Sequence, residues 1–203
     1  SNLRDGTSQF SLLETVQYNQ TAMGNRLLRS FFYRPLCTIN HIQTRQQHVQ
    51  VFVDNPQILQ KVREELSHIL DIERLSSRIA MEKAHGKDIQ ALKNSLKQWL
   101  KVRSFLEKLD SSAYGSLTGN LEIQSGETII ALIEQSILED PSTSLTEGRL
   151  IKDGWSQDLD HYRQIQTHFT EFLDTYLEQE KAATGIQNLK IRYNRNIGYY
   201  LEV

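Results

Sequence analysis

The sequence predicts a mainly α-helical protein, an elongated helical bundle with two long helices and a short antiparallel β-strand pair at its end. Three observations lead to this fold class. Only three prolines interrupt 203 residues, so strong helix breakers are rare. Apolar side chains recur every three or four positions over most of the chain, which is the helical period. Only the last segment, from Leu189, alternates apolar and basic side chains as a half-buried strand does.

Residues 1–86 are predicted to form a core of short helices. The residues expected to start or stop these helices are Thr7 or Ser8, Thr21, Pro35, Asn55 before Pro56, and Asp71. Asn55 in particular is expected to accept a backbone N–H at the start of its helix. Gly24 lies early in the second helix, where glycine costs about 1 kcal/mol relative to alanine. Two explanations are open: another backbone approaches closely there, or the helix start is frayed.

Residues 87–185 are predicted to contain the two long helices. The first begins at Gly86 and ends near Asp110, so it is about 35 Å long. A shorter helix is expected over 128–138. The second long helix runs from Trp155 to about Ala183, and Gly185 is expected to stop it.

The second long helix carries an apolar seam close to heptad spacing, which indicates a long helical partner. Its members are Trp155, Leu159, Tyr162, Ile165, Phe169, Phe172 and Tyr176. We expect the half near Phe172 to be frayed or to pair with the same helix of another molecule, because exposed apolar side chains are unfavourable. The alternative is that residues 111–125 or the 128–138 helix cover it.

Residues 186–203 are predicted to form two strands joined by a turn over 194–198. Because side chains alternate across a strand, Lys190, Arg192 and Asn194 share one face, and Arg195 lies in the turn. These four residues are the candidate DNA-binding residues, through phosphate contacts that are independent of sequence. The alternative is an outward face that serves solubility alone. Because the chain stops on a strand that has just begun to pair, we expect a segment of a longer protein.

Composition and motifs argue against several function classes. The net charge of −2 excludes a globally basic nucleic-acid binder, and the single cysteine, Cys37, excludes a disulfide framework. No phosphate-binding loop, dinucleotide fingerprint or His-Glu-x-x-His motif is present, so no catalytic, cofactor-binding or metal-binding residue is predicted. Cys37 is expected to be a buried structural thiol. No apolar run reaches a membrane span and no signal peptide is visible, so a cytoplasmic location without membrane contact is expected.

The segment Asp71–Ile79 combines an acidic start with arginines one helical turn apart. One interpretation is a capped helix held by salt bridges, since acidic residues suit a helix N-terminus. The other interpretation is a contact to a neighbouring domain that moves.

Five segments, in order, resemble the core domain of the MutS family of DNA mismatch-repair proteins. They are Thr21–Arg29 with Arg34–Leu36, Ile42–Arg45, Asp71–Ile79, Glu147–Asp160, and Leu189–Asn194 with Gly198–Val203. The fourth resembles the segment that leads into the family's lever helix, and the fifth resembles the strand pair that begins its clamp. One such block is weak, but five in the family's order are specific.

The resemblance implies a large ATPase that dimerises around mismatched double-stranded DNA and works with mismatch-repair partner proteins. This chain would supply the helical core, the lever helix and the first clamp strands. ATP and Mg²⁺ are expected for the parent protein, but no ATPase activity is expected for this segment, because it has no phosphate-binding loop. The alternative is an unrelated helical scaffold that binds proteins through its coiled-coil seam.

Overall fold

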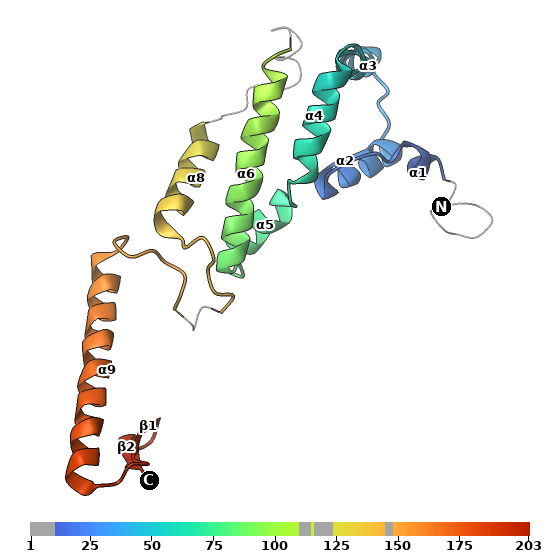
Figure 1. Cartoon of the computed structure of the whole chain (residues 1–203). Coiled ribbons are helices and arrows are strands. Elements are labelled where there is room, and N and C mark those ends of the chain that lie inside the picture. The colour runs from blue at the N-terminus through green and yellow to red at the C-terminus, as the bar shows by residue number, and fades with distance from the viewer. Residues whose placement is uncertain (1–10, 110–114, 116–123, 145–147) are drawn as a thin grey trace. The chain divides into compact units, whose positions relative to one another are not determined.

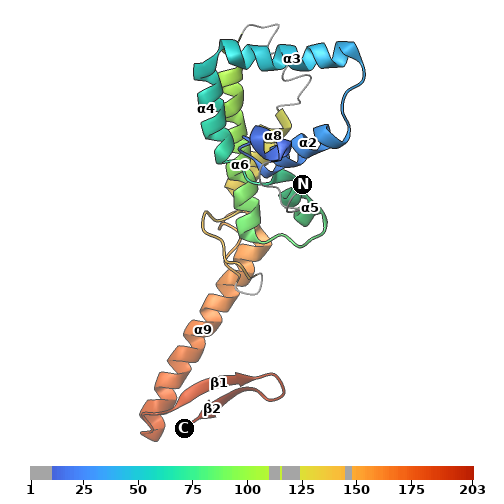
Figure 2. The same ribbon diagram turned by 90° about the vertical axis from the view of Figure 1, so that its right-hand side faces the viewer.

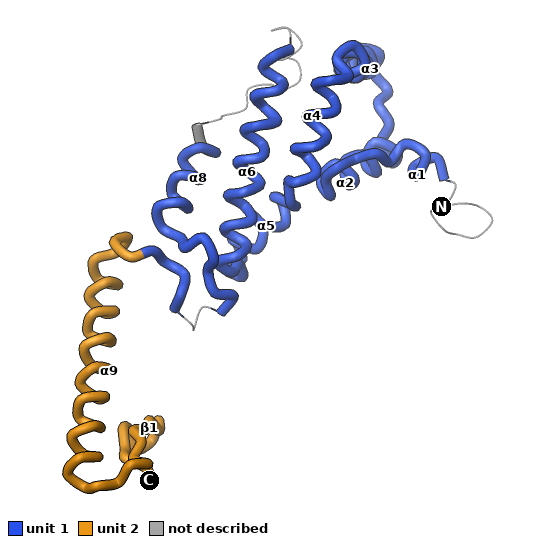
Figure 3. Tube along the Cα trace, viewed as in Figure 1, with its two compact units in different colours: residues 1–152 blue, residues 153–203 orange. Residues whose placement is uncertain are grey.

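The structure, a computed structural model, describes residues 11–109, 115, 124–144 and 148–203. The chain divides into two units, residues 1–152 and residues 153–203 (Figure 3). The predicted fold class is confirmed: the described residues are mainly helical, with one two-stranded antiparallel sheet at the end of the chain. None of the described helices contains an apolar stretch of the length that a membrane span needs.

Three helices of the first unit, α4, α6 and α8, lie side by side (Figure 1). The helices of this unit are α1 (Leu12–Val16), α2 (Ala22–Tyr33), α3 (Ile39–Asp54), α4 (Pro56–Ser67), α5 (Ile72–Ala80), α6 (Gly86–Leu106) and α8 (Gln124–Ser136). Helix α3 crosses one end of α4, and α5 packs near the start of α6 (Figure 2).

Two of the predicted helix caps are confirmed, and one is wrong. Thr21 Oγ1 accepts the Gly24 N–H at 3.0 Å at the start of α2, and Asp71 Oδ1 accepts the Arg74 N–H at 3.3 Å at the start of α5. Helix α4 begins at Pro56 as predicted, but the Asn55 side chain accepts no cap hydrogen bond there; its Nδ2 donates to the Val51 carbonyl at 2.8 Å. The Asn55 side chain therefore pairs with a backbone carbonyl in the last turn of α3 rather than with a backbone N–H at the start of α4.

Other helix boundaries differ from the sequence prediction. Helix α8 begins at Gln124, earlier than the predicted Thr128. Helix α1 begins after Ser11, whose Oγ accepts the Glu14 N–H at 3.3 Å. The predicted caps Thr7 and Ser8 lie outside the described residues.

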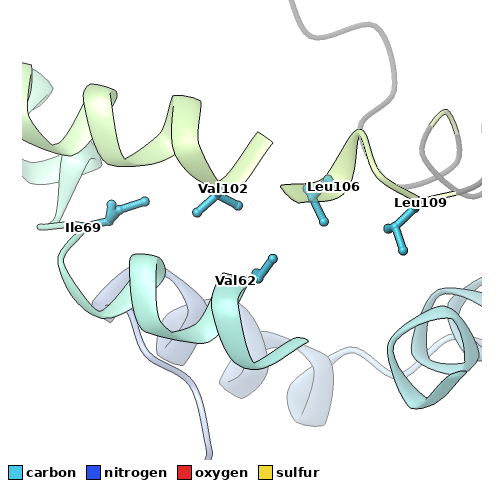
Figure 4. Close-up of a cluster of buried hydrophobic side chains, with 5 residues drawn as sticks. All are labelled: Val62, Ile69, Val102, Leu106 and Leu109. Atoms are coloured by element: carbon cyan, nitrogen blue, oxygen red, sulfur yellow. The ribbon is translucent and has the colours of Figure 1, made fainter. Parts of the chain in front are cut away.

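The first unit has an apolar cluster between α4 and α6 (Figure 4). Its members are Val62, Ile69, Val102, Leu106 and Leu109. Val102 is the most buried of them, with 2% of its surface exposed. Trp99 and Phe52 pack against the cluster from α6 and α3, so the cluster joins α3, α4 and α6.

A second layer of contacts joins α6 to α8. Ile130 and Ile133 of α8 are buried, and Lys97 of α6 forms an ion pair with Glu134. This lysine's hydrogen bond lowers the pKa of the Glu134 carboxyl. Gln90 of α6 donates to the Leu138 carbonyl at 2.5 Å.

The close glycine contact of this unit is at Gly86 rather than at Gly24. A Cβ on Gly86 would lie 2.7 Å from Leu150 Cδ2 and 2.7 Å from Pro141 Cβ. A Cβ on Gly24 would meet only the side chains of Thr21, at 3.0 Å, and Asn19, at 3.5 Å. Of the two explanations left open for Gly24, the close approach of another backbone is therefore wrong, since the nearest atoms belong to the side chains of Thr21, which caps the helix, and Asn19.

The second unit consists of α9 (Gln157–Thr184) and a hairpin of β1 (Lys190–Asn194) and β2 (Gly198–Glu202). Ser156 Oγ accepts the Leu159 N–H at 3.4 Å and caps α9. The predicted stop at Gly185 is confirmed: its φ of 73° lies in the left-handed region that glycine tolerates, and its N–H donates to the Lys181 carbonyl.

Candidate nucleic-acid interface on the terminal hairpin

The hairpin is built on a three-residue turn. Asn194 pairs with Gly198 across the strands, so residues 195–197 form the loop. Asn194 Oδ1 accepts the Asn196 N–H at 2.8 Å, and Gly198 has a φ of 88°. A left-handed glycine after three loop residues is the usual way to close such a hairpin. Both predicted strands are present, and each extends one residue into the predicted turn over 194–198.

One face of the hairpin is aromatic and contacts α9. Tyr199 of β2 packs edge-on against Phe169 of α9, with ring centroids 5.5 Å apart. Tyr193, opposite Tyr199 in the register, has its ring centroid 5.0 Å from that of Tyr199. Leu189, just before β1, is 5% exposed. The contact between Tyr199 and Phe169 joins the hairpin to the helix.

The opposite face carries the candidate DNA-binding residues. By strand alternation, Lys190, Arg192 and Asn194 lie on the face away from Tyr193, and all three are exposed. Arg195 lies in the turn and is also exposed. The structure therefore brings the four predicted residues together along one strand and its turn.

Sequence reasoning missed an acidic residue on this face. Glu202 pairs with Lys190 in the register and forms an ion pair with Arg192. The positive charge of Arg192 is thus partly compensated. The register of the two strands would have predicted this ion pair. Once Asn194 is paired with Gly198, Glu202 and Arg192 are diagonal neighbours on the same face.

The apolar seam of α9 is largely exposed. The exposed fractions are 68% for Tyr162, 50% for Ile165, 44% for Phe169, 64% for Phe172 and 40% for Tyr176. Glu180 raises the pKa of Tyr176 through its negative charge and a hydrogen bond. The helix is continuous through this half, so fraying is not observed and pairing with another copy stays a prediction. Of the proposed covering segment 111–125, residues 111–114 and 116–123 lie outside the described part.

The segment Asp71–Ile79 forms a capped helix tied to its neighbours by ion pairs. Arg26 of α2 donates to both oxygens of Asp71, at 2.6 and 2.7 Å, and also to Glu73. These hydrogen bonds from the guanidinium lower the pKa of Asp71 to about 2. Arg78 pairs with Asp88 of α6 at 2.9 Å. These contacts confirm the structural interpretation of this segment.

Among the described residues, no three His, Cys, Asp or Glu side chains gather closely enough to hold a metal ion. Cys37 is exposed, so the prediction of a buried thiol is wrong. It lies in the link between α2 and α3, outside the packed helices.

Comparison with known proteins identifies the family. The model of MutS domain III matches residues 1–190. The chain is 44% identical over its whole length to the DNA mismatch repair protein MutS of Treponema denticola, of which it spans 23%. It is 40% identical over 95% of its length to the MutS of Caldicellulosiruptor bescii, of which it spans 22%, and 35% identical over its whole length to that of Methanosarcina mazei, of which it spans 23%.

The chain thus spans less than a quarter of the length of these curated relatives. The family match covers both the helical unit and α9, and it ends at the first residue of β1. The chain therefore belongs to the MutS family of DNA mismatch repair proteins and corresponds to its domain III.

Proposed function

We propose that this chain is the lever and clamp base of a MutS-like DNA mismatch-repair ATPase. The observation that carries the proposal is the second unit: one continuous 28-residue helix with a hairpin fixed to its side. At 1.5 Å per residue, the helix is about 42 Å long. Because its backbone hydrogen bonds keep its length constant, a rotation at one end becomes a displacement at the other.

The hairpin supplies the DNA-side end of this lever. Lys190 and Arg195 offer positive charge on an exposed strand and turn, and Asn194 offers an amide beside them. Such groups contact phosphates without reading sequence. Since Tyr199 packs on Phe169, a force on the hairpin passes directly to α9.

The remaining activities belong to the longer protein. ATP and Mg²⁺ would bind outside these 203 residues, because the sequence has no phosphate-binding loop. Mismatched double-stranded DNA, a second copy of the protein and mismatch-repair proteins are the proposed partners, and the cytoplasm is the proposed location. In this proposal the core between α4 and α6 is the rigid base of the lever.

A salt titration of DNA binding by the longer protein tests the DNA-side role. Lys190→Gln should weaken binding to duplex DNA of any sequence and reduce the slope of log K against log salt by about 0.9, the value for one lost phosphate contact. Arg192→Gln should change the slope less, because Glu202 already pairs with that arginine. Lys87→Gln, the same charge change in α6, is the matched control and should have no effect. Equal slopes for the Lys190→Gln variant and the unmodified protein would contradict the proposal.

The exposed seam of α9 favours a second candidate function, a scaffold for protein–protein contact. Phe172 and Tyr162 are about two thirds exposed, which suits a helical partner. The two candidates differ in their DNA dependence. If Phe172→Glu abolishes association with a partner protein and Lys190→Gln leaves DNA binding unchanged, the scaffold function is favoured.

A further inference from the structure

The chain is anchored separately on the two sides of the boundary between its units. On the first side, the Lys152 N–H donates to the Ser136 carbonyl at 2.8 Å, and Lys152 Nζ donates to the Glu134 carbonyl at 2.6 Å. Ile151 forms a bridge with Ile137 at the end of α8. Lys152 is therefore fixed to α8 by its backbone and by its side chain.

On the second side, the next two residues are fixed to α9. Arg163 donates to Asp153 Oδ1 at 2.7 Å and lies 3.3 Å from Asp160 Oδ1. The Gly154 N–H donates to Asp160 Oδ2 at 2.8 Å. We call the four residues Asp153, Gly154, Asp160 and Arg163 the latch.

The geometry of the latch explains why these residue types stand at this spacing. Gly154 has a φ of 82°, so the chain turns sharply there in a conformation that strains other residues. Asp160 and Arg163 are three apart, so they share one face of α9 near its start. Asp160 uses one oxygen for the turn and presents the other to Arg163.

Favourable interaction with the helix N-terminus alone does not account for Asp160. Asp158 is also acidic and lies in the same first turn. Asp160 differs because its carboxylate accepts from a residue outside the helix, Gly154, and because it is only 28% exposed. Arg163 is similarly covered, at 29%. A partly buried carboxylate bonded to a backbone N–H and a guanidinium is a stronger anchor than an exposed ion pair.

We infer that Asp160 and Arg163 are positioning residues that lock the Asp153–Gly154 turn onto the first two turns of α9. The peptide link between Lys152 and Asp153 is then the pivot between the two units, because the residues on both sides of it are anchored. Because the latch fixes the Asp153–Gly154 turn to α9, it makes the helix and that peptide link move together. This inference concerns contacts within the chain and stands whether or not the proposed DNA-repair role holds.

Amide hydrogen exchange measured by NMR tests the latch itself on the 203-residue chain. In Asp160→Ala, the Gly154 amide should exchange about tenfold faster or more, because a hydrogen bond to a charged acceptor contributes roughly that factor. Asp158→Ala is the matched control and should leave the Gly154 amide unchanged. Asp160→Asn keeps an oxygen acceptor, so it should retain most of the protection. If circular dichroism shows that α9 is lost in Asp160→Ala, the distance measurement on Arg163→Met described next tests the latch in its place.

Distances between two spin labels, measured by double electron–electron resonance, test whether the latch restricts the movement of α9. Spin labels at Asn94 of α6 and Gln179 of α9, both exposed, span the two units in a Cys37→Ser background. The distance distribution should broaden in Arg163→Met relative to the unmodified chain. A pair at Asn94 and Gln60, within the first unit, should show no change.

Three results would overturn the inference. One is unchanged Gly154 exchange in Asp160→Ala with α9 intact. Another is faster Gly154 exchange in Asp160→Ala together with an unchanged distance distribution in Arg163→Met. That combination would mean that the latch caps α9 but does not position it. The third is a distribution already as broad in the unmodified chain as in the variant.

Discussion

Val102 offers the sharpest test of the helical core. Its side chain is 2% exposed and lies between Val62, Ile69 and Leu106 where α6 meets α4. Val102→Ala removes two buried methyl groups, each worth about 0.8 kcal/mol of transfer free energy, and leaves a cavity besides. The expected loss in the free energy of unfolding is therefore at least about 1.6 kcal/mol, before the gain in helix propensity that alanine brings.

The matched control is Val53→Ala in α3. Val53 is 63% exposed, so the same substitution removes little buried surface. Both valines lie in helices, so the gain in helix propensity, up to about 0.7 kcal/mol, cancels in the comparison. Val102→Ala should destabilise the first unit by at least about 1.6 kcal/mol more than Val53→Ala.

Urea unfolding followed by tryptophan fluorescence measures this difference. Trp99 packs against the apolar cluster, whereas Trp155 lies in the second unit. In a Trp155→Phe background the signal comes from Trp99 alone, so the transition of the first unit is observed by itself. If the two valine variants differ by less than about 0.5 kcal/mol, the position of the core between α4 and α6 is wrong.

Three further predictions concern an ion pair, a close contact and a surface. The pKa of Asp71 is about 2 in the fold against an ordinary value of 3.8, so its pairing with Arg26 should stabilise the fold above about pH 4, and this contribution should be lost as the pH falls toward 2. Asp71→Asn should therefore be less stable than the unmodified chain at pH 7 but equally stable near pH 2 in urea titrations. Gly86→Ala should destabilise the fold by about 1–3 kcal/mol because of its contacts with residues 141 and 150, whereas Gly126→Ala, with no atom within 4 Å of its Cβ position, should not lower the melting temperature. Phe172→Glu should abolish self-association at high concentration in sedimentation equilibrium without changing the melting of the first unit, and a chain that is monomeric before the substitution would exclude pairing through the seam.

Local signals in the sequence were sufficient for most of the helices. Thr21 and Asp71 cap α2 and α5 as predicted, because a capping side chain acts on backbone groups within three residues. Gly185 ends α9 for an equally local reason, its left-handed backbone. These features do not depend on distant parts of the chain, so periodicity and capping rules find them.

Features that depend on distant residues were not predictable from the sequence. Gly86 stands at the start of α6, where a glycine suggests only a helix boundary, but its lack of a side chain is required by Pro141 and Leu150. Helix α8 begins at Gln124 and includes Gly126, although glycine disfavours helix. The buried Ile130 and Ile133 of this helix contribute packing against α6 that local propensity does not include.

The candidate site was partly predictable. Strand alternation placed Lys190, Arg192 and Asn194 on one face, and the hairpin has that arrangement. The compensating charge of Glu202 required the exact register, which depends on the left-handed Gly198. The contact of Tyr199 with Phe169 required the fold of the hairpin against α9, for which the sequence has no local signal.

The most direct test of the lever is ATP turnover by the longer protein, with and without mismatched DNA, when α9 is interrupted. Thr170 lies within α9 and is exposed, and proline there breaks the helix at a cost of about 3 kcal/mol or more. Thr170→Ala leaves the helix intact and is the control. If the proposed lever role is right, Thr170→Pro should keep the turnover rate measured without DNA but lose any change in rate on adding mismatched DNA, whereas Thr170→Ala should keep both. If Thr170→Pro responds to mismatched DNA as the unmodified protein does, α9 is not the lever.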